Sequence, residues 1–249
     1  MKRLITASIT LAIALALAGP AVASDIAVAP IQLSIPSGDG AAVMNIQNKS
    51  TYPVRLQITG SAWDQQPNGV MKLTPSEDLI FFPTLVTVAP LETQQIRIGV
   101  EGGAASTERT FRVFINELPS INEALTGHSI AVRLKVGVPV FVEPSRQVRA
   151  LAIPSATLAS GKIDFSLRNN GTVREMIDKI EVAGLDAGGK TVAGASADAW
   201  YVLAGGRRDF SLPFSKAACR SVSSINITAQ TNLGPVVLRD VPLANKSCK

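Results

Sequence analysis

The chain has 249 residues, of which 46% are hydrophobic and 17% charged, and its formal net charge is +5. Two cysteines and one histidine are too few to build a zinc site from these residue types. The small excess of Lys and Arg contains no long basic run and no interleaved aromatic side chains, so we expect neither a metal centre nor a nucleic-acid partner.

The N-terminus is predicted to be a secretory signal peptide. Lys2 and Arg3 precede the nearly uncharged apolar residues 4–18, and Ala21-Val22-Ala23 supplies a cleavage site of small residues. The apolar run is too short for a membrane span, and no later segment approaches about 18 uninterrupted apolar residues. We therefore expect an exported protein that begins at Ser24 and has no stable membrane insertion. Loss of residues 1–23 leaves 22 Lys and Arg against 19 Asp and Glu, a net charge of +3.

The remaining 226 residues are predicted to be all-β and to form two domains. Short apolar runs alternate with Gly, Pro, Asn and Ser, and no amphipathic helix of three turns stands out. Together with residues 129–144, the strands expected in the first domain, residues 24–144, give about the number that an immunoglobulin-like sandwich needs. They are residues 26–35, 42–47, 54–63, 79–83, 86–90, 95–98 and 110–118.

Residues 129–144, SIAVRLKVGVPVFVEP, have the most regular pattern in the chain. Aliphatic side chains occupy every second position at Ile130, Val132, Leu134, Val136 and Val138. Because side chains alternate between the two faces of a strand, these five share one face. Such a row either lines the core of its own domain or is offered, with a free backbone edge, to another chain. The polar loop before it contains His128, which we interpret as a solvated loop residue.

The second domain, residues 145–249, follows Pro144, which stops the strand ladder. Its expected strands are residues 148–153, 163–167, 177–182, 200–203, 210–214, 225–229 and 236–241. Cys219 and Cys248 are predicted to form one disulfide in an oxidising compartment, worth roughly 3.5 kcal/mol for a loop of about 30 residues. A thiol metal site is the alternative, but the chain offers no further cysteine for it.

Several different short motifs follow one another along the two halves of the chain. They are Phe82-Pro83, Val88-Ala89-Pro90, and residues 95–98, 111–119, 141–144, 167–171 and 200–206. In this order, after a signal peptide, they resemble the periplasmic pilus chaperones of the chaperone/usher pathway. The resemblance covers nearly the whole mature chain.

The resemblance implies two immunoglobulin-like domains set at an angle and a function without catalysis. In this family the pilus subunit is an incomplete sandwich without its last strand. The chaperone lends its alternating strand until another subunit replaces it at an outer-membrane usher, a known form of strand addition. The five aliphatic residues at 130–138 match the family's donor row, and their burial would contribute about 25 cal/mol per Å².

One feature of the better-known branch of the family is not matched. That branch holds the C-terminal carboxylate of the subunit with an Arg on the first strand and a Lys late in the donor strand, and Gln32 and Pro139 align with those positions. Residues 111–113, Phe-Arg-Val, are more similar to the archaic branch, which is related to spore-coat-U and Csu-type systems. This implies that Arg112 anchors the carboxylate, with Lys135 as its partner. A solvated surface residue or an internal ion pair is the alternative for both.

Other classes of protein fit the sequence less well. A secreted two-domain immunoglobulin-like adhesin or binding module is the alternative function, but it needs no aliphatic row beside a long loop. A pilus subunit would be a shorter, single domain. Neither an enzyme nor a cofactor is expected, because we find no Gly-x-Ser-x-Gly elbow, no His-Glu-x-x-His pair and no phosphate-binding loop.

Overall fold

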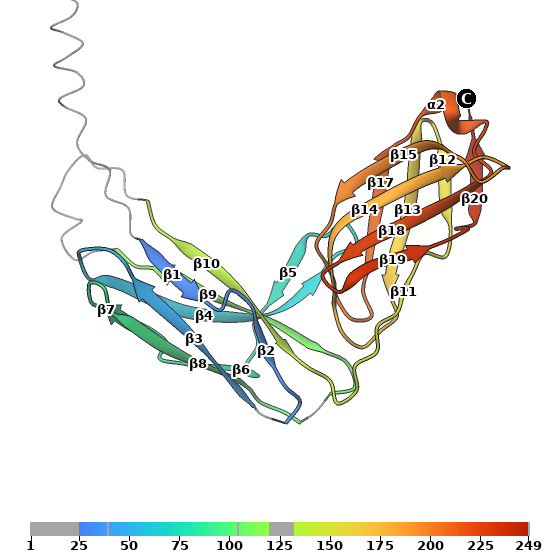
Figure 1. Cartoon of the computed structure of the whole chain (residues 1–249). Helices are drawn as coiled ribbons and strands as arrows, with labels where there is room; N and C mark the ends of the chain where they lie inside the picture. The colour runs from blue at the N-terminus through green and yellow to red at the C-terminus, as the bar shows by residue number, and fades with distance from the viewer. Residues whose placement is uncertain (1–24, 39, 104, 120–131, 249) are drawn as a thin grey trace, which may run out of the picture.

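The computed structural model describes residues 25–38, 40–103, 105–119 and 132–248, and strands dominate these ranges. The predicted signal peptide, Ile130 and His128 lie outside the described residues. The all-β fold class predicted from the sequence is confirmed (Figure 1). The strands of the first half are β1 (Ile26–Ala29), β2 (Leu33–Ile35), β3 (Ala41–Asn48), β4 (Val54–Gln65), β5 (Met71–Thr74), β6 (Leu79–Phe82), β7 (Leu85–Val88), β8 (Thr93–Val100), β9 (Arg109–Glu117) and β10 (Lys135–Val142).

The strands of the first half form two sheets that pack as a sandwich. One sheet has the order β1-β3-β8-β6, and the other has the order β2-β10-β9-β4-β5 with β7 also paired to β4. All of these pairs are antiparallel except β10 with β2. The opening strand expected at residues 26–35 is therefore two strands, one in each sheet, as in immunoglobulin-like sandwiches whose first strand is shared.

Period-two alternation along these strands forms the core of the first sandwich. Met44 and Ile46 of β3 and Val113 and Ile115 of β9 have no exposed surface. The residues that alternate with them on β9, Arg112 and Phe114, face the other side of the sheet. One face of β9 therefore stabilises the sandwich, while the opposite face is available for contacts outside it.

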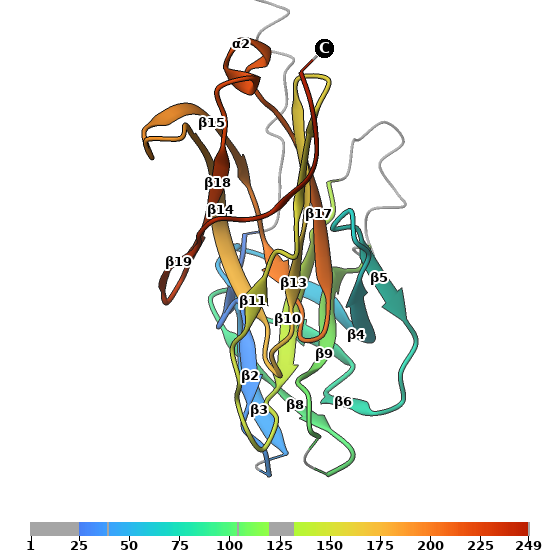
Figure 2. The ribbon, with the colours of Figure 1, turned by 90° about the vertical axis from the view of Figure 1, so that its right-hand side faces the viewer.

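The second half repeats the architecture with its own core. One sheet has the order β11-β13-β12-β20 with β17 also paired to β13, and the other has the order β15-β14-β18-β19 with β16 also paired to β14. Figure 2 shows these two sheets facing each other, with β13 and β17 in one and β14 and β18 in the other. The elements are β11 (Leu151–Ala152), β12 (Ala156–Ala159), β13 (Lys162–Asn169), β14 (Glu175–Leu185), β15 (Thr191–Asp198), β16 (Tyr201–Val202), β17 (Arg207–Pro213), the short helix α2 (Lys216–Cys219), β18 (Ser224–Thr231), β19 (Gly234–Leu238) and β20 (Leu243–Ser247).

A disulfide ties the end of the chain to the second sandwich. It joins Cys219, at the end of α2, to Cys248, just after β20, with 5.6 Å between the Cα atoms. Strand β20 pairs in parallel with β12 at the edge of its sheet. The disulfide thus secures a terminal edge strand that would otherwise fray easily.

Each sandwich has its own corner built around a buried asparagine. Asn48, at the end of β3, accepts a hydrogen bond from the N–H of Ser50 and donates to the carbonyls of Tyr52 and Val88. Asn169, at the end of β13, accepts from the N–H of Gly171 and donates to the carbonyls of Val173 and Val202. Each side chain closes a turn and ties it to a distant strand, which satisfies backbone groups that would otherwise be buried without partners.

The sandwiches meet at a bend, with the β4–β5 hairpin reaching from the first to the second (Figure 1). At its tip the carbonyl of Pro67 accepts a hydrogen bond of 2.7 Å from the N–H of Asp209 on β17. The guanidinium of Arg208 covers Gly69, where an added Cβ would lie only 2.5 Å from Arg208 Cζ. Gly69 also has a φ of +86°, so the turn requires glycine for its conformation, and a larger residue there would displace Arg208.

Candidate functional site

One side of strand β10 is open along most of its length. β10 pairs with β9 from Lys135 to Val142, but on its other side it pairs with β2 only at residues 140–142. The carbonyl of Leu134 accepts from the N–H of Glu117, so even-numbered residues direct their backbone groups toward β9. The N–H of Glu143 donates to Ile35 of β2, so odd-numbered residues direct theirs to the opposite side. We call that side of residues 135–139 the open edge, since no described strand pairs with it.

The aliphatic row runs from solvent into the core of the first sandwich. Val132 is 69% exposed, and Leu134 and Val136 are partly buried. Val138 is only 1% exposed and belongs to the core of its own domain, together with Val140. The strand is also shorter than the expected 129–144, because residues 132–134 precede β10. Val138 therefore lies where it cannot meet another chain, contrary to the role expected from its place in the row, and the accessible part of the row is Val132 to Val136.

Arg112 lies on the outward face of β9, opposite Pro139 of β10. Its Nη2 donates a hydrogen bond of 3.1 Å to the carbonyl of Gly137, and its Nη1 lies 3.7 Å from the sulfur of Met71. Its Cζ is 5.4 Å from the ring centroids of both Trp63 and Trp200, one from each sandwich.

The charge of Arg112 is poorly compensated. Burial lowers the pKa of its guanidinium, and Nε is buried without a hydrogen-bond partner. Among the described residues no carboxylate forms an ion pair with it. A desolvated cation of this kind favours an anion that arrives from outside the chain.

Lys135 shares the outward face with Arg112 but lies farther along the strand. It is opposite Asn116, four residues from Pro139, which corresponds to about 13 Å along a strand. Its Nζ is 4.9 Å from the ring centroid of Phe114, which separates it from Arg112. The structure therefore places the two basic residues on one face without bringing them together in the way that a jointly held carboxylate requires.

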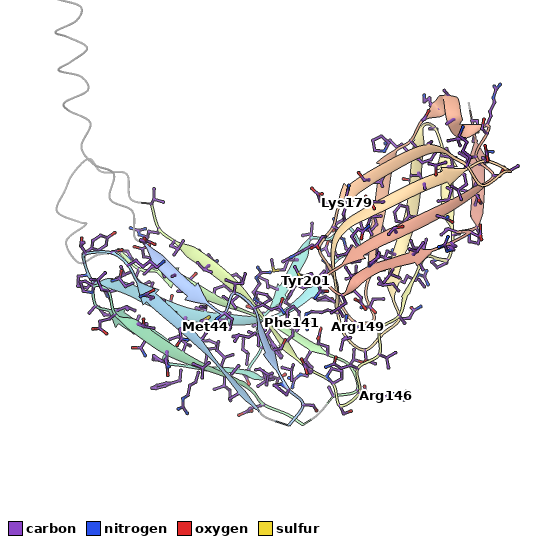
Figure 3. The ribbon with its side chains drawn as sticks, in the orientation of Figure 1. Met44, Phe141, Arg146, Arg149, Lys179 and Tyr201 are labelled. Carbon is purple, nitrogen blue, oxygen red and sulfur yellow. A yellow bond between two sulfur atoms is a disulfide. The ribbon has the colours of Figure 1, made fainter. Side chains whose placement is uncertain are left out.

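Aromatic side chains from both sandwiches surround Arg112 at the bend. Trp63 lies 5.7 Å from Phe141, 5.5 Å from Trp200 and 5.5 Å from Tyr201 between ring centroids. Figure 3 shows Phe141 and Tyr201 at the junction, where their ring centroids are 5.3 Å apart. The hydroxyl of Tyr201 donates to Gln32 Oε1 at 2.6 Å. Gln32, which aligns with one member of the basic pair of the better-known branch, thus adjoins this cluster, and Pro139, which aligns with the other, lies opposite Arg112.

A buried ion pair beside the cluster also joins the two sandwiches. Arg174 Nη1 lies 2.5 Å from Glu108 Oε2, and the carboxylate of Glu108 is completely buried. Arg174 Cζ is 3.6 Å from the ring centroid of Phe141. Burial raises the pKa of Glu108, although the nearby charge of Arg174 opposes this. Sequence reasoning missed this pair because its members lie 66 residues apart in different domains and neither belongs to a recognisable motif.

No candidate for a metal centre or a membrane span appears in the part of the chain that the structure describes. There, no group of three or more His, Cys, Asp or Glu side chains is placed to hold a metal ion. No helix in the same ranges has the length and hydropathy needed to cross a bilayer.

Comparison with protein families identifies the first sandwich. Residues 25–147 match the family described as "Pili and flagellar-assembly chaperone, PapD N-terminal domain". The chain belongs to the pilus chaperone family. Pilus chaperones are not enzymes, so the prediction of a protein without catalytic function is confirmed at the level of the family. A comparison with curated proteins found no match.

Solved structures extend the likeness to both sandwiches of this pilus chaperone. The class 5 fimbriae chaperone CfaA is 15% identical, with a TM-score of 0.60, and covers 88% of this chain and 100% of its own. The complex of CsuC with the tip subunit CsuE, from archaic Csu pili of Acinetobacter baumannii, matches at 16% identity and a TM-score of 0.58, covering 88% of this chain and 99% of that one. The SafB chaperone complex with SafA pilin from Salmonella enterica matches at 16% identity and a TM-score of 0.57, covering 88% and 98%. At these identities the likeness concerns the fold, and it confirms the two immunoglobulin-like domains.

Proposed function

We propose that this chain is a periplasmic chaperone that binds pilus subunits by donor-strand complementation and delivers them to an outer-membrane usher. The observation that carries the proposal is the open edge of β10 next to the exposed Val132 and the partly buried Leu134. An open edge supplies main-chain hydrogen bonds to any added strand, and the aliphatic side chains supply apolar burial. Each of them contributes roughly 1.5–3 kcal/mol when it becomes fully buried.

Similar solved structures support the class of partner. A chaperone of CFA/I fimbriae biogenesis was solved in complex with a tip adhesin, CsuC with the tip subunit CsuE, and SafB with SafA pilin. Export by the predicted signal peptide would place this chain in the compartment where such subunits fold. The resemblance of residues 111–113 to the archaic branch further suggests a partner of that type.

Arg112 is the proposed anchor for the C-terminal carboxylate of the subunit. It is a half-buried guanidinium with an unpartnered Nε, and no described carboxylate neutralises it. Because an Arg fork holds a carboxylate through two parallel hydrogen bonds, Arg112 suits this task without a second cation. Lys135 then contributes a more distant positive charge rather than a direct contact.

Co-expression in the periplasm with candidate pilin subunits tests the proposal. Leu134→Glu should abolish recovery of the complex while the free protein stays folded, since it puts a charge into the apolar groove of the subunit. Val237→Glu is the control, because Val237 is 43% exposed on β19, the edge strand of a sheet in the second sandwich. Normal recovery with Leu134→Glu would exclude strand donation.

The anchor is tested in the same assay. Arg112→Ala should weaken capture of the subunit more than Gln32→Ala, although both residues adjoin the aromatic cluster. Equal effects would contradict the assignment of Arg112. A secreted adhesin or binding module, the alternative function, would show no loss with either variant, because it has no need of the open edge.

A further inference from the structure

The side chain of Arg112 crosses over Gly137 to reach the open edge. Its Nη2 donates to the Gly137 carbonyl at 3.1 Å, and that carbonyl belongs to an odd-numbered residue whose backbone groups face away from β9. An added Cβ at position 137 would lie 2.9 Å from Arg112 Nε and 3.0 Å from Phe114 Cε1. Gly137 is therefore needed for the space it leaves, and without it the guanidinium would not lie over the edge.

The Gly137 carbonyl is a central acceptor that an added strand would use. Lys135 and Gly137 direct their N–H and C=O groups to the open edge, whereas Pro139 has no N–H to offer. A hydrogen bond from a charged donor is stronger than one from a neutral amide. A strand that pairs with β10 therefore competes with Arg112 for this carbonyl.

A carboxylate is the group that would draw Arg112 away. The guanidinium has one good acceptor, a neutral carbonyl, and a sulfur at 3.7 Å, while Nε has none. A carboxylate accepts two parallel hydrogen bonds from an Arg fork and carries the compensating charge. We propose that Arg112 is a latch on the open edge, which closes the Gly137 carbonyl in the free chain and releases it for strand pairing when a carboxylate binds.

This latch rests on the proposed function, since it presumes that the edge receives a strand. It adds a regulatory step, because a strand that arrives without a free carboxylate finds the Gly137 carbonyl already hydrogen-bonded to Arg112. Linkage makes the effect reciprocal, so that occupation of the Gly137 carbonyl by a strand strengthens carboxylate binding by the same factor.

Nuclear magnetic resonance of the isotopically labelled full mature chain, without any subunit, tests the latch. The Gly137 carbonyl carbon, detected through the N–H of Val138, and the Arg112 Nε–H are followed while N-acetylglycine is added, with N-acetylglycinamide as the uncharged control. Both signals should move with one saturation curve for the carboxylate and remain in place for the amide. In Arg112→Met the carbonyl signal of the free chain should already lie where saturating carboxylate brings it in the wild type.

The variant Gly137→Ala separates the effect of the hydrogen bond to the Gly137 carbonyl from the effect of the positive charge of Arg112. The new methyl group displaces the guanidinium from the carbonyl of residue 137, while Arg112 keeps its charge. Because the carboxylate no longer has to break this hydrogen bond, N-acetylglycine should bind about tenfold more tightly, within the range typical of coupled sites. Gly103→Ala is the control, because nothing lies within 4 Å of a Cβ added there. The latch is refuted if neither signal saturates, if the Arg112 signal saturates while the carbonyl stays in place, or if Gly137→Ala binds no more tightly. Failure of the proposed function would be seen instead as loss of subunit capture with the latch signals intact.

Discussion

Replacing Arg174 with methionine removes the positive charge that faces Glu108 across the bend. The carboxylate of Glu108 is 0% exposed and the side chain of Arg174 is 16% exposed, so solvent screens little of the interaction. Methionine retains apolar contact with Phe141, but it leaves the carboxylate with the backbone N–H of residue 174, at 3.1 Å, in place of the ion pair. Breaking one partner of a buried pair costs about 3–5 kcal/mol, or roughly 10² to 10⁴ in the unfolding equilibrium constant.

Urea denaturation followed by tryptophan fluorescence measures this loss. Trp63 and Trp200 both lie at the junction, so their emission reports on the region that the variant disturbs. The double variant Glu108→Gln, Arg174→Met should be less destabilised than Arg174→Met alone, since it leaves no buried charge without a partner. A single variant that loses less than about 1 kcal/mol, or a double variant that loses more than the single, would contradict the reasoning.

The same variant should change the pH dependence of stability. Burial already raises the pKa of Glu108 above its ordinary value of 4.5, and Arg174 opposes this through its charge and hydrogen bonds. Without Arg174 the pKa of the folded state rises further, so the folded variant binds the proton more tightly than the unfolded chain. The contribution of Glu108 to the stability of the variant is then fully present below pH 4.5 and is lost as the pH rises through the folded pKa. The deficit of Arg174→Met should therefore shrink on acidification from pH 7, and a deficit that grows would refute this origin.

Three further variants test other parts of the structure by denaturant unfolding. Replacement of Cys219 and Cys248 by serine should cost about 3.5 kcal/mol, and dithiothreitol should then have no further effect on the variant, whereas it destabilises the wild type. Asn169→Ala should cost about 3 kcal/mol because it leaves three backbone groups without partners, while the exposed neighbour Asn170→Ala should change stability by less than about 0.5 kcal/mol. Tyr201→Phe should cost about 1 kcal/mol through loss of the hydrogen bond to Gln32, and an unchanged midpoint would show that this bond contributes nothing.

The fold was predictable because period-two alternation is a local property. The runs around Val113 and Ile227 alternate in the sequence, and in the structure both residues are buried in their sandwich cores. The asparagine corners were less visible. Asn48 and Asn169 lie just beyond the strands expected at residues 42–47 and 163–167, and nothing in their immediate sequence reveals the distant carbonyls of Val88 and Val202 that they reach.

The candidate site was predictable only in part, because alternation does not show where a strand leaves its domain. Val132 and Val138 have the same side chain and the same parity, yet one is 69% exposed and the other 1%. The difference arises from β2, β9 and the facing sheet, whose ends decide how much of the row is covered. Likewise, Arg112 was identified from a resemblance, but its contact with Trp200 depends on how the second sandwich meets the first.

The bend between the sandwiches has a consequence for how the chain is put together. It is held by the hairpin tip on β17, by the pair of Glu108 and Arg174, and by Tyr201 on Gln32. These contacts involve different strands and none of them belongs to the connecting residues 143–150. The angle is thus set by contacts between folded surfaces, and the connection adds to them where the N–H of Ser145 donates to the carbonyl of Ala105 and Arg149 pairs with Glu175. A chain cut at one bond within the connection is expected to reassemble from its two pieces at the original angle.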